Sequence, residues 1–109
     1  MIIDMKNGKK EIFPNFKGGE KEMEATMFFD GTNRILHAVL KPGASIGYHK
    51  HEGNAEMIYI LSGRAKYLMD DGVEYMEAGQ CHYCAEGHSH SMINDSDADV
   101  EFFAVVPKQ

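Results

Sequence analysis

The sequence has few cysteines, no long hydrophobic run and no excess of basic charge. Its two cysteines, Cys81 and Cys84, are too few for a disulfide scaffold and fit a reducing compartment. No stretch of about 18 apolar residues occurs, and Met1 to Lys6 show no basic leader followed by a sustained apolar run. We therefore expect a protein that lies in the cytoplasm and has no membrane partner.

The charge balance argues against a nucleic-acid partner. Lys and Arg number 11 against 17 Asp and Glu, which gives a formal net charge of -6 at pH 7 with neutral histidine. The basic residues are scattered along the chain and form no stripe on one element. Because nucleic-acid binding depends on clustered basic charge, we expect no such partner.

The length of 109 residues is that of one ordinary domain, residues 1–109. With 43% hydrophobic and 26% charged residues, the composition is that of a globular chain with a packed core. A domain of this size buries roughly 60 to 65% of its unfolded surface, so a bound metal or a partner subunit would add useful stability. We expect a homodimer in which the apolar segment Met1–Met5 adds to a neighbour's sheet edge; the alternative is a frayed terminus.

Glycines divide residues 31 to 90 into pieces shorter than a typical helix, which favours short strands. The pair Asp71-Gly72 predicts a tight hairpin between residues 64–69 and 73–76. Residues 22–29 are predicted as a strand, with a helical turn as the alternative. The other strand candidates are residues 34–40, 56–61, 88–93 and 100–106. Eight or more strands at this spacing predict an all-β sandwich or barrel.

Four of the six histidines and one glutamate have a spacing typical of a metal site. His49 and His51 stand at i and i+2, which in a strand puts both rings on one face about 6.6 Å apart. Glu56 opens the next strand, and a neighbouring strand lies only about 4.8 Å away, so its carboxylate could reach the same point. A sheet that closes on itself could add one ring of His88-Ser89-His90. Together they would supply three nitrogens and one oxygen.

The alternative for any single histidine is an ordinary surface or hydrogen-bonded role, and an isolated H-x-H pair arises easily by chance. We assign that ordinary role to His37 and His82. The larger set, however, matches a family pattern. Residues 43–63 resemble the first cupin motif, G-x5-H-x-H-x4-E-x6-G, at every defined position from Gly43 to Gly63. The second cupin motif, G-x5-P-x-G-x2-H-x3-N, aligns with Gly79, Gly87, His90 and Asn94.

This resemblance implies a jelly-roll barrel, the double-stranded β-helix of the cupins, with its site motifs within residues 43–94. It also implies that His49, His51, Glu56 and His90 bind a divalent metal inside the barrel. His88 is not assigned by the motif and is expected at the pocket mouth or beside a metal ligand. Two positions depart from the pattern: Ala85 replaces the usual proline and does not fix φ as proline does, and Gln80 replaces a frequent aspartate.

Three imidazoles and one carboxylate fill four positions of an octahedron and leave two adjacent positions open. Such a site suits Mn or Fe first, with Zn, Ni, Co or Cu as alternatives. Its positive centre favours a small anionic or enolisable chelating molecule. The expected function is a small metalloenzyme of the dioxygenase, isomerase or lyase type, with Glu56 as the candidate catalytic residue. The alternative is a binding or sensing module without turnover; the absence of an attached DNA-binding segment favours the enzyme.

The remaining polar residues near the motifs carry less information. Cys81 and Cys84 stand at i and i+3 in a presumed strand, where they point to opposite faces, so we expect buried thiols and no redox pair. For Tyr48 and Tyr83 we favour core packing over hydrogen bonds into the pocket. A sugar-phosphate isomerase would want a basic pocket, and the basic residues nearest the motifs are only Lys50, Arg64 and Lys66.

Overall fold

A computed structural model describes all 109 residues, and its regular secondary structure is almost entirely strand. One short 3-10 helix, η1 (Phe16–Gly18), lies between the first two strands. The strands are β1 (Glu11–Pro14), β2 (Glu22–Phe29), β3 (Arg34–Leu40), β4 (Ser45–Lys50), β5 (Glu56–Ser62), β6 (Arg64–Met69), β7 (Gly72–Glu77), β8 (Cys81–Cys84), β9 (Ser89–Ile93) and β10 (Val100–Val106).

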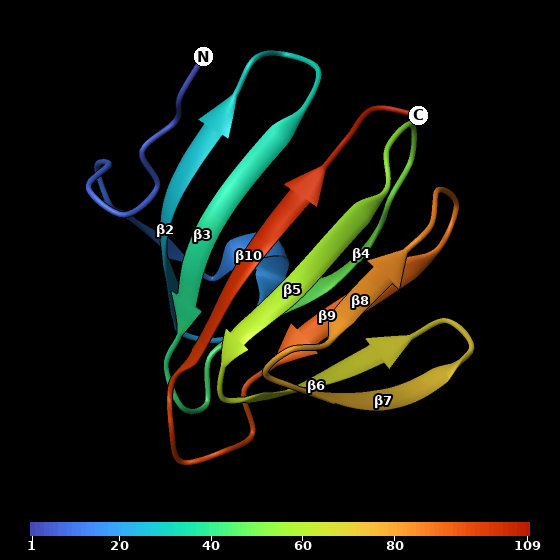
Figure 1. Cartoon of the computed structure of the whole chain (residues 1–109). Helices are drawn as coiled ribbons and strands as arrows, with labels where there is room; N and C mark the ends of the chain where they lie inside the picture. The colour runs from blue at the N-terminus through green and yellow to red at the C-terminus, as the bar shows by residue number, and fades with distance from the viewer.

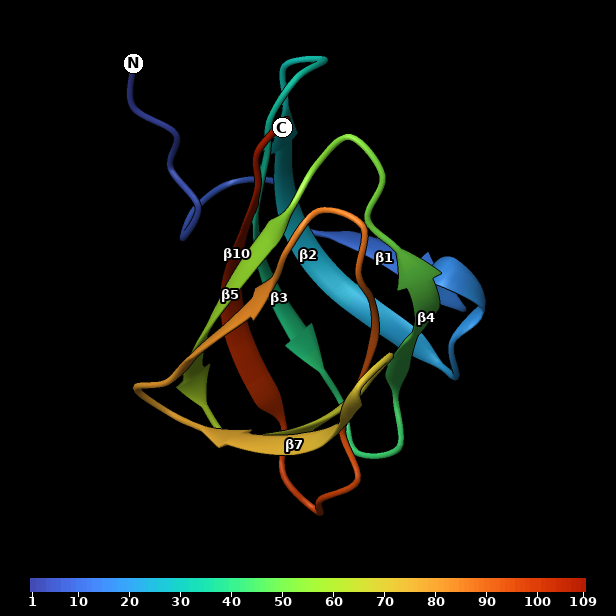
Figure 2. The same ribbon diagram turned by 90° about the vertical axis from the view of Figure 1, so that its right-hand side faces the viewer.

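These strands form two antiparallel sheets. The six-stranded sheet has the order β1-β2-β3-β10-β5-β8, and the four-stranded sheet has the order β4-β9-β6-β7. Most of the larger sheet faces the viewer in Figure 1. Figure 2 shows the strands curving around an interior, with β4 across from β5 and β10. The predicted all-β fold of the cupin jelly-roll type is confirmed. No helix in the structure has the length and apolar character needed to cross a membrane.

Buried and outward side chains alternate along the strands, and this alternation produces the core. In β10 every second side chain is buried, beginning with Val100, and the intervening ones point outward. β3 and β5 follow the same period, so one face of the larger sheet packs against the facing sheet. The largest fully buried side chains include Tyr67 and Phe102. The resulting core cluster contains 16 buried residues drawn from both sheets.

The structure confirms the predicted hairpin and corrects the account of the first residues. β6 and β7 pair from Arg64↔Glu77 to Met69↔Gly72, with Gly72 in a positive-φ conformation. Strand β1 was not predicted; it pairs with β2 at the edge of the larger sheet. The segment Met1–Met5 forms no strand within this chain, and Met1 and Ile2 are almost fully exposed.

Two glycines let η1 lie directly against β4. A Cβ atom on Gly47 would overlap the carbonyl oxygen of Lys17, and a Cβ on Gly19 would overlap the carbonyl oxygen of Ser45. The backbones therefore approach more closely than any other residue would allow. This contact brings Phe16 and Lys17 to the rim of the interior pocket.

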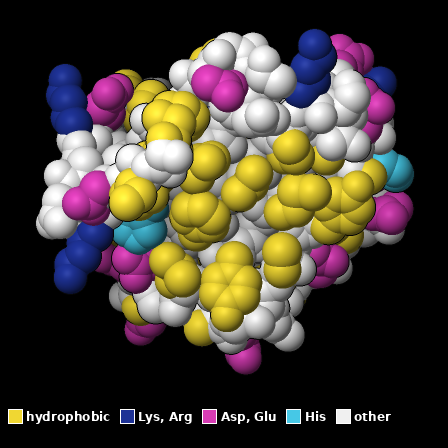
Figure 3. Space-filling view, turned by 45° about the horizontal axis from the view of Figure 1, so that its top comes forward, with side chains coloured by type: hydrophobic (Ala, Val, Ile, Leu, Met, Phe, Trp, Pro, Cys, Tyr) yellow, Lys and Arg dark blue, Asp and Glu magenta, His cyan; other side chains and the backbone are white.

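The outer face of the larger sheet carries several exposed apolar side chains. Residues directed outward include Tyr59 and Leu61 on β5 and Tyr83 on β8, each more than 40% exposed. Phe103 on β10 pairs across the sheet with Tyr59, which makes the surface continuous. Figure 3 shows hydrophobic side chains gathered over the middle of the visible face.

Candidate metal centre

The four residues predicted to bind a metal converge in the barrel interior. His49 lies on β4, His51 follows the last residue of that strand, Glu56 opens β5 and His90 lies on β9. One donor atom from each of these residues lies within 4.8 Å of all the others. His51, Glu56 and His90 are buried, and His49 is half-buried. The group could therefore hold one metal ion.

The strands deliver these side chains differently from the sequence-based expectation. Glu56 was placed on a strand adjacent to that of His49, and His90 was expected from closure of the sheet. Instead β4 pairs directly with β9, so that His49 and His90 are cross-strand partners. β5 belongs to the other sheet, and Glu56 reaches the centre from across the interior. After β4 the chain crosses from the four-stranded to the six-stranded sheet, and residue spacing alone does not reveal this crossing.

The three imidazole rings surround one point. Their centroids are 4.8 to 4.9 Å apart and their planes are inclined at 63 to 71° to one another. The Nε2 atoms of His51 and His90 lie 3.2 and 3.0 Å from Oε1 of Glu56. The Nε2 atoms of these two rings are also only 3.0 Å apart. Such crowding of nitrogen and oxygen donors is what a bound cation would relieve.

Each histidine is oriented by a partner at its other ring nitrogen. Nδ1 of His49 lies 2.7 Å from the carbonyl oxygen of Gly47, and Nδ1 of His51 lies 2.7 Å from Oδ1 of Asn54. Both partners accept hydrogen bonds, so Nδ1 carries the proton and Nε2 keeps its lone pair. Nδ1 of His90 lies 3.0 Å from Nε2 of His82. Metal-binding histidines commonly have this arrangement.

The electrostatics keep the carboxylate ionised. Burial raises the pKa of Glu56, but the adjacent His51 and His90 rings lower it overall to about 2. Burial lowers the pKa of His49, which favours the neutral imidazole that a metal requires. For His51, burial also lowers the pKa, but hydrogen bonds with Glu56 and Asn54 outweigh it and raise the pKa overall.

The other histidines lie outside the four-residue cluster. His37 forms an ion pair with Glu101 at 2.7 Å, consistent with its expected ordinary role. His88 was expected at the pocket mouth or beside a metal ligand; it is exposed, pairs with Asp70 at 3.2 Å and lines a separate surface hollow. His82 does not join the cluster, but it contacts His90 directly, a contact that its ordinary assignment did not predict.

A pocket of about 90 Å³ opens beside the cluster and is lined by all four of its residues. Its walls include the apolar side chains of Leu36, Ile58 and Met92. Two cations that the sequence analysis missed also line it: Lys17 from η1 and Arg34 from β3. The Nε atom of Arg34 is buried and has no hydrogen-bond partner. Its guanidinium group stacks on Phe29 at 4.5 Å.

The basic residues expected nearest the site are divided by the fold. Lys50 lines the pocket, whereas Arg64 stacks on Tyr75 at 4.3 Å, and neither Arg64 nor Lys66 lines the pocket. No sequence signal marks Lys17 or Arg34, because both precede the motifs and reach the pocket only through the folding of η1 and β3 against the barrel.

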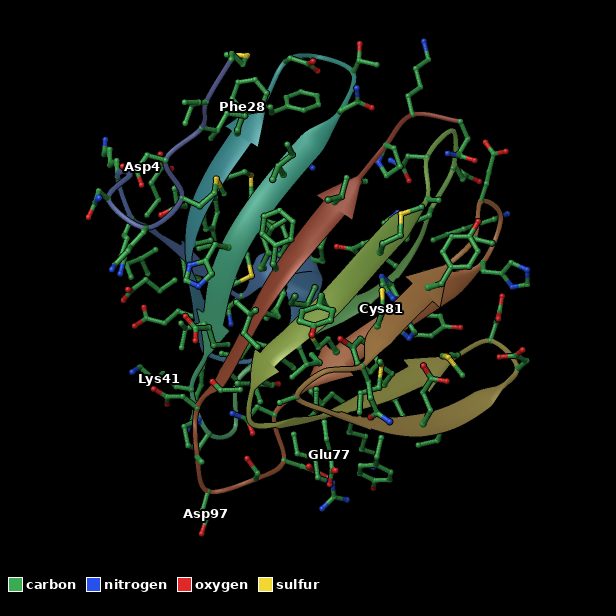
Figure 4. All side chains as sticks on the ribbon, viewed as in Figure 1. Asp4, Phe28, Lys41, Glu77, Cys81 and Asp97 are labelled. Atoms are coloured by element: carbon green, nitrogen blue, oxygen red, sulfur yellow. The ribbon has the colours of Figure 1, made fainter.

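The cysteines and tyrosines fit the expectations only in part. Cys81 and Cys84 point to opposite faces of β8 and form no disulfide, as expected. Cys84 is buried, but Cys81 is exposed, so the prediction of two buried thiols is wrong for Cys81. Figure 4 labels Cys81 on β8, beside β5. Tyr48 and Tyr83 are 55 and 60% exposed, so neither packs in the core, because each falls on the outward face of its strand.

The turn before His90 forms without the proline of the family pattern. The amide of His88 donates to the carbonyl of Ala85, and the amide of Gly87 donates to the carbonyl of His51. Gly87 adopts a φ of 87°, which its lack of a side chain permits. Asn94 is fully buried and donates to the carbonyls of Leu40 and Ala98, which fixes the chain after β9.

Residues 36–106 match the Cupin_2 family, described as "Cupin domain". The chain belongs to the cupin family. This cupin is 32% identical over 113 residues to an oxalate-binding protein of Thermotoga maritima, and the alignment covers 97% of this chain and 93% of the relative. Two solved structures show the same architecture over the whole chain.

The first is the crystal structure of a predicted oxalate decarboxylase from Thermotoga maritima. It is 30% identical, has a TM-score of 0.91, and each of the two chains is fully covered. The second is a polyketide cyclase from Streptomyces resistomycificus, which is 21% identical with a TM-score of 0.81. That alignment covers all of this cupin and 80% of the cyclase, and at this identity it shows a shared fold only.

Proposed function

We propose that this cupin binds a divalent transition metal through His49, His51, Glu56 and His90, and binds a small dicarboxylate of the oxalate type beside it. The observation that carries the proposal is that one pocket is lined by the four donor residues and by Arg34, whose Nε is buried without a hydrogen-bond partner. A buried guanidinium nitrogen without a partner costs free energy, so a ligand oxygen at that position would stabilise the protein.

The size of the pocket supports a small ligand. One water needs roughly 10 to 15 Å³ of cavity volume, so the pocket of about 90 Å³ has room for a small ligand. Oxalate, a small dicarboxylate, falls in this size class.

The charge of the pocket supports an anion. Lys17, Arg34 and Lys50 line it, and Glu56 is the single acidic residue among the lining side chains. The charge of Lys17 also disfavours protonation of His51. Arg34 could hold a carboxylate through a charge-assisted hydrogen bond, while the apolar wall of Leu36, Ile58 and Met92 excludes water from the other side.

The metal that we propose is manganese or iron first, with zinc, nickel, cobalt or copper as alternatives, because nitrogen and oxygen donors without thiolate suit this group. A divalent ion would act as a Lewis acid toward a chelating carboxylate. The protein residues hold the donor atoms in place: the partners at each Nδ1 fix the rings, and Glu56 supplies the anionic oxygen. The names of the relatives, an oxalate-binding protein and a predicted oxalate decarboxylase, support this ligand class.

Reversible binding is the function that the pocket side chains favour over turnover. Apart from the four candidate metal ligands, no lining residue is a carboxylate or a histidine, the side chains that most often transfer protons in catalysis. A metalloenzyme remains the second candidate, favoured by the similarity to the predicted oxalate decarboxylase. In that case Glu56 would have to carry the proton as well as hold the metal.

The test is calorimetric titration of the manganese-loaded protein with oxalate, malonate and acetate. Oxalate should bind, and EDTA treatment should abolish the binding. Arg34→Met should weaken oxalate binding by roughly 10- to 100-fold, as loss of a charge-assisted hydrogen bond does. Arg64→Met is the matched control, because Arg64 also stacks on an aromatic ring but lies outside the pocket. Equal oxalate affinity with and without metal would overturn the proposal, whereas release of formate or carbon dioxide would indicate the enzyme.

We further propose that residues 1–109 act as one cupin domain, that the protein resides in the cytoplasm and that it forms a homodimer. The unpaired thiols of Cys81 and Cys84 support a reducing compartment. The continuous apolar outer face of the larger sheet, with Tyr59, Leu61 and Tyr83 exposed, supports association with a second copy.

A further inference from the structure

A chain of side chains leads from His90 away from the pocket to the protein surface. Nε2 of His90 faces Glu56 at the centre of the cluster. Its Nδ1 lies 3.0 Å from Nε2 of His82, and Nδ1 of His82 is hydrogen-bonded to Oε1 of Glu74. Three strands supply the three residues: β9, β8 and β7. Because β8 and β7 belong to different sheets, the chain spans both walls of the barrel.

His82 is held firmly in this position. It is only 2% exposed, and its ring stacks on Tyr67 with a centroid distance of 3.9 Å and an angle of 12°. The rings of His82 and His90 are also nearly parallel, at 14°. Glu74, in contrast, has a side chain that is 41% exposed and lines the surface hollow on the far side of His82.

The hydrogen bonds can be assigned a direction from chemistry alone. An ionised carboxylate only accepts, so the proton between Glu74 and His82 belongs to Nδ1 of His82. A neutral His82 then has a lone pair on Nε2, which accepts the Nδ1 proton of His90. His90 is left with its Nε2 lone pair directed at the cluster. The reverse assignment would put a proton on that Nε2 atom, where a metal could not bind.

We propose that His82 and Glu74 are positioning residues that select the metal-binding tautomer of His90 and increase its electron donation. His49 and His51 have neutral acceptors at Nδ1, a carbonyl and an amide oxygen, whereas the hydrogen-bond chain of His90 ends on a full negative charge. His90 is therefore the most strongly donating of the three rings. This inference depends on the metal site and not on which ligand the pocket accepts.

The test measures metal affinity without any pocket ligand, by competition between the protein and a chelator for Zn²⁺. His82→Phe keeps a flat ring against Tyr67 but removes both nitrogens, and it should weaken binding about 10- to 100-fold. Glu74→Gln keeps an acceptor oxygen but removes the charge, and should weaken binding by a smaller factor. The matched controls are His37→Phe and Glu101→Gln, which alter a similar histidine–carboxylate pair away from the site and should leave the affinity unchanged.

A second measurement reports the protonation of the ring nitrogens directly and does not depend on how well a variant packs. In the zinc-loaded protein with ¹⁵N-labelled histidine, NMR should show His82 protonated at Nδ1 and unprotonated at Nε2, with a protected Nδ1 proton on His90. Glu74 is partly exposed, so Glu74→Gln should fold even if His82→Phe does not, and it should shift the ¹⁵N signals of both rings. A protonated Nε2 on His82, or unchanged zinc affinity together with unchanged signals in Glu74→Gln, would overturn the inference.

Discussion

His49 and His90 are direct cross-strand partners on β4 and β9, and their ring centroids lie 4.8 Å apart. Backbone pairing of the two strands therefore fixes this separation before any ion binds. The other two candidate ligands, His51 and Glu56, lie at the two ends of the loop that connects β4 to β5 in the other sheet. A site organised in this way should bind metal with little rearrangement of the backbone.

We predict about one divalent metal ion per chain. His51→Ala or His90→Ala removes one of the four donors. Loss of a residue that is only hydrogen-bonded to a metal ligand costs roughly 10- to 100-fold in affinity, and these two substitutions should cost more. Elemental analysis of protein purified without chelators measures the stoichiometry, and competition with a chelator measures the affinity. His37→Ala is the control and should keep full occupancy, because His37 pairs with Glu101 outside the cluster.

The same prediction has a stability readout. An ion present at about 100 times its Kd should add about 2.7 kcal/mol to the free energy of unfolding. For a domain of this size, EDTA should then lower the Tm by roughly 10 °C. No metal after reconstitution, or equal losses in His51→Ala, His90→Ala and His37→Ala, would show that these residues do not form the site.

Glu56→Gln tests the single anionic donor. The substitution keeps the shape and one oxygen but raises the charge of the site by one unit, so metal should bind more weakly. If oxalate is turned over and Glu56 also carries a proton, activity per bound metal should fall by about a hundredfold to ten-thousandfold. A purely ligating role predicts activity that follows occupancy. Metal content and turnover are measured on the same samples, and unchanged metal affinity would remove Glu56 from the site.

The two cysteines should differ sharply in reactivity. Burial, together with the negative charges of Glu56 and Asp70, raises the pKa of Cys84 to about 11, whereas Cys81 is exposed. At about pH 8 a disulfide reagent such as DTNB should therefore modify Cys81 quickly and Cys84 only on unfolding. Cys81→Ser should remove the fast phase and Cys84→Ser the slow one. Two equal rates in the native protein would contradict this assignment.

Because its pKa is raised, Cys84 should also make the folded protein less stable as the pH becomes alkaline. Its ordinary pKa is 9.0, so the unfolded chain releases this proton at lower pH than the native protein does. The contribution of the Cys84 thiol to the free energy of unfolding is complete below about pH 9 and is lost as the pH rises toward about 11. Cys84→Ala should flatten this part of a Tm-against-pH profile, and Cys81→Ala serves as the comparison.

Sedimentation at micromolar concentration should show a homodimer, because the chain combines an apolar outer sheet face with an apolar first segment. Deleting residues 1–6 should weaken association if Met1–Met5 adds to a neighbour's sheet edge. Tyr59→Lys should weaken it if the sheet faces meet, since Tyr59 is central in that surface and 44% exposed. A monomer at this concentration would exclude the dimer.

The sequence predicted the features that depend on local spacing. The hairpin at Gly72 and the strands that match β2, β3 and β10 follow from turn residues and alternating apolar positions. The cupin motifs singled out the four residues that converge in the interior.

The partners of the site could not be predicted, because they depend on how distant segments meet. Arg34 enters the pocket from β3 and Lys17 from η1, and neither stands near a motif. His82 seemed an ordinary histidine, since its contact with His90 joins β8 of the larger sheet to β9 of the smaller sheet. The outward positions of Tyr48 and Tyr83 follow from strand register, which residue type does not determine.

The candidate metal ligands are divided between the two walls of the barrel. His49 and His90 belong to the four-stranded sheet, and Glu56 belongs to the six-stranded sheet. An ion held by all four donors would therefore act as a non-covalent cross-link between the sheets. Separation of the sheets would have to break bonds to the ion first, so the bound metal should slow unfolding. The rate at which a chelator strips the metal from the native protein would then report how often the barrel opens.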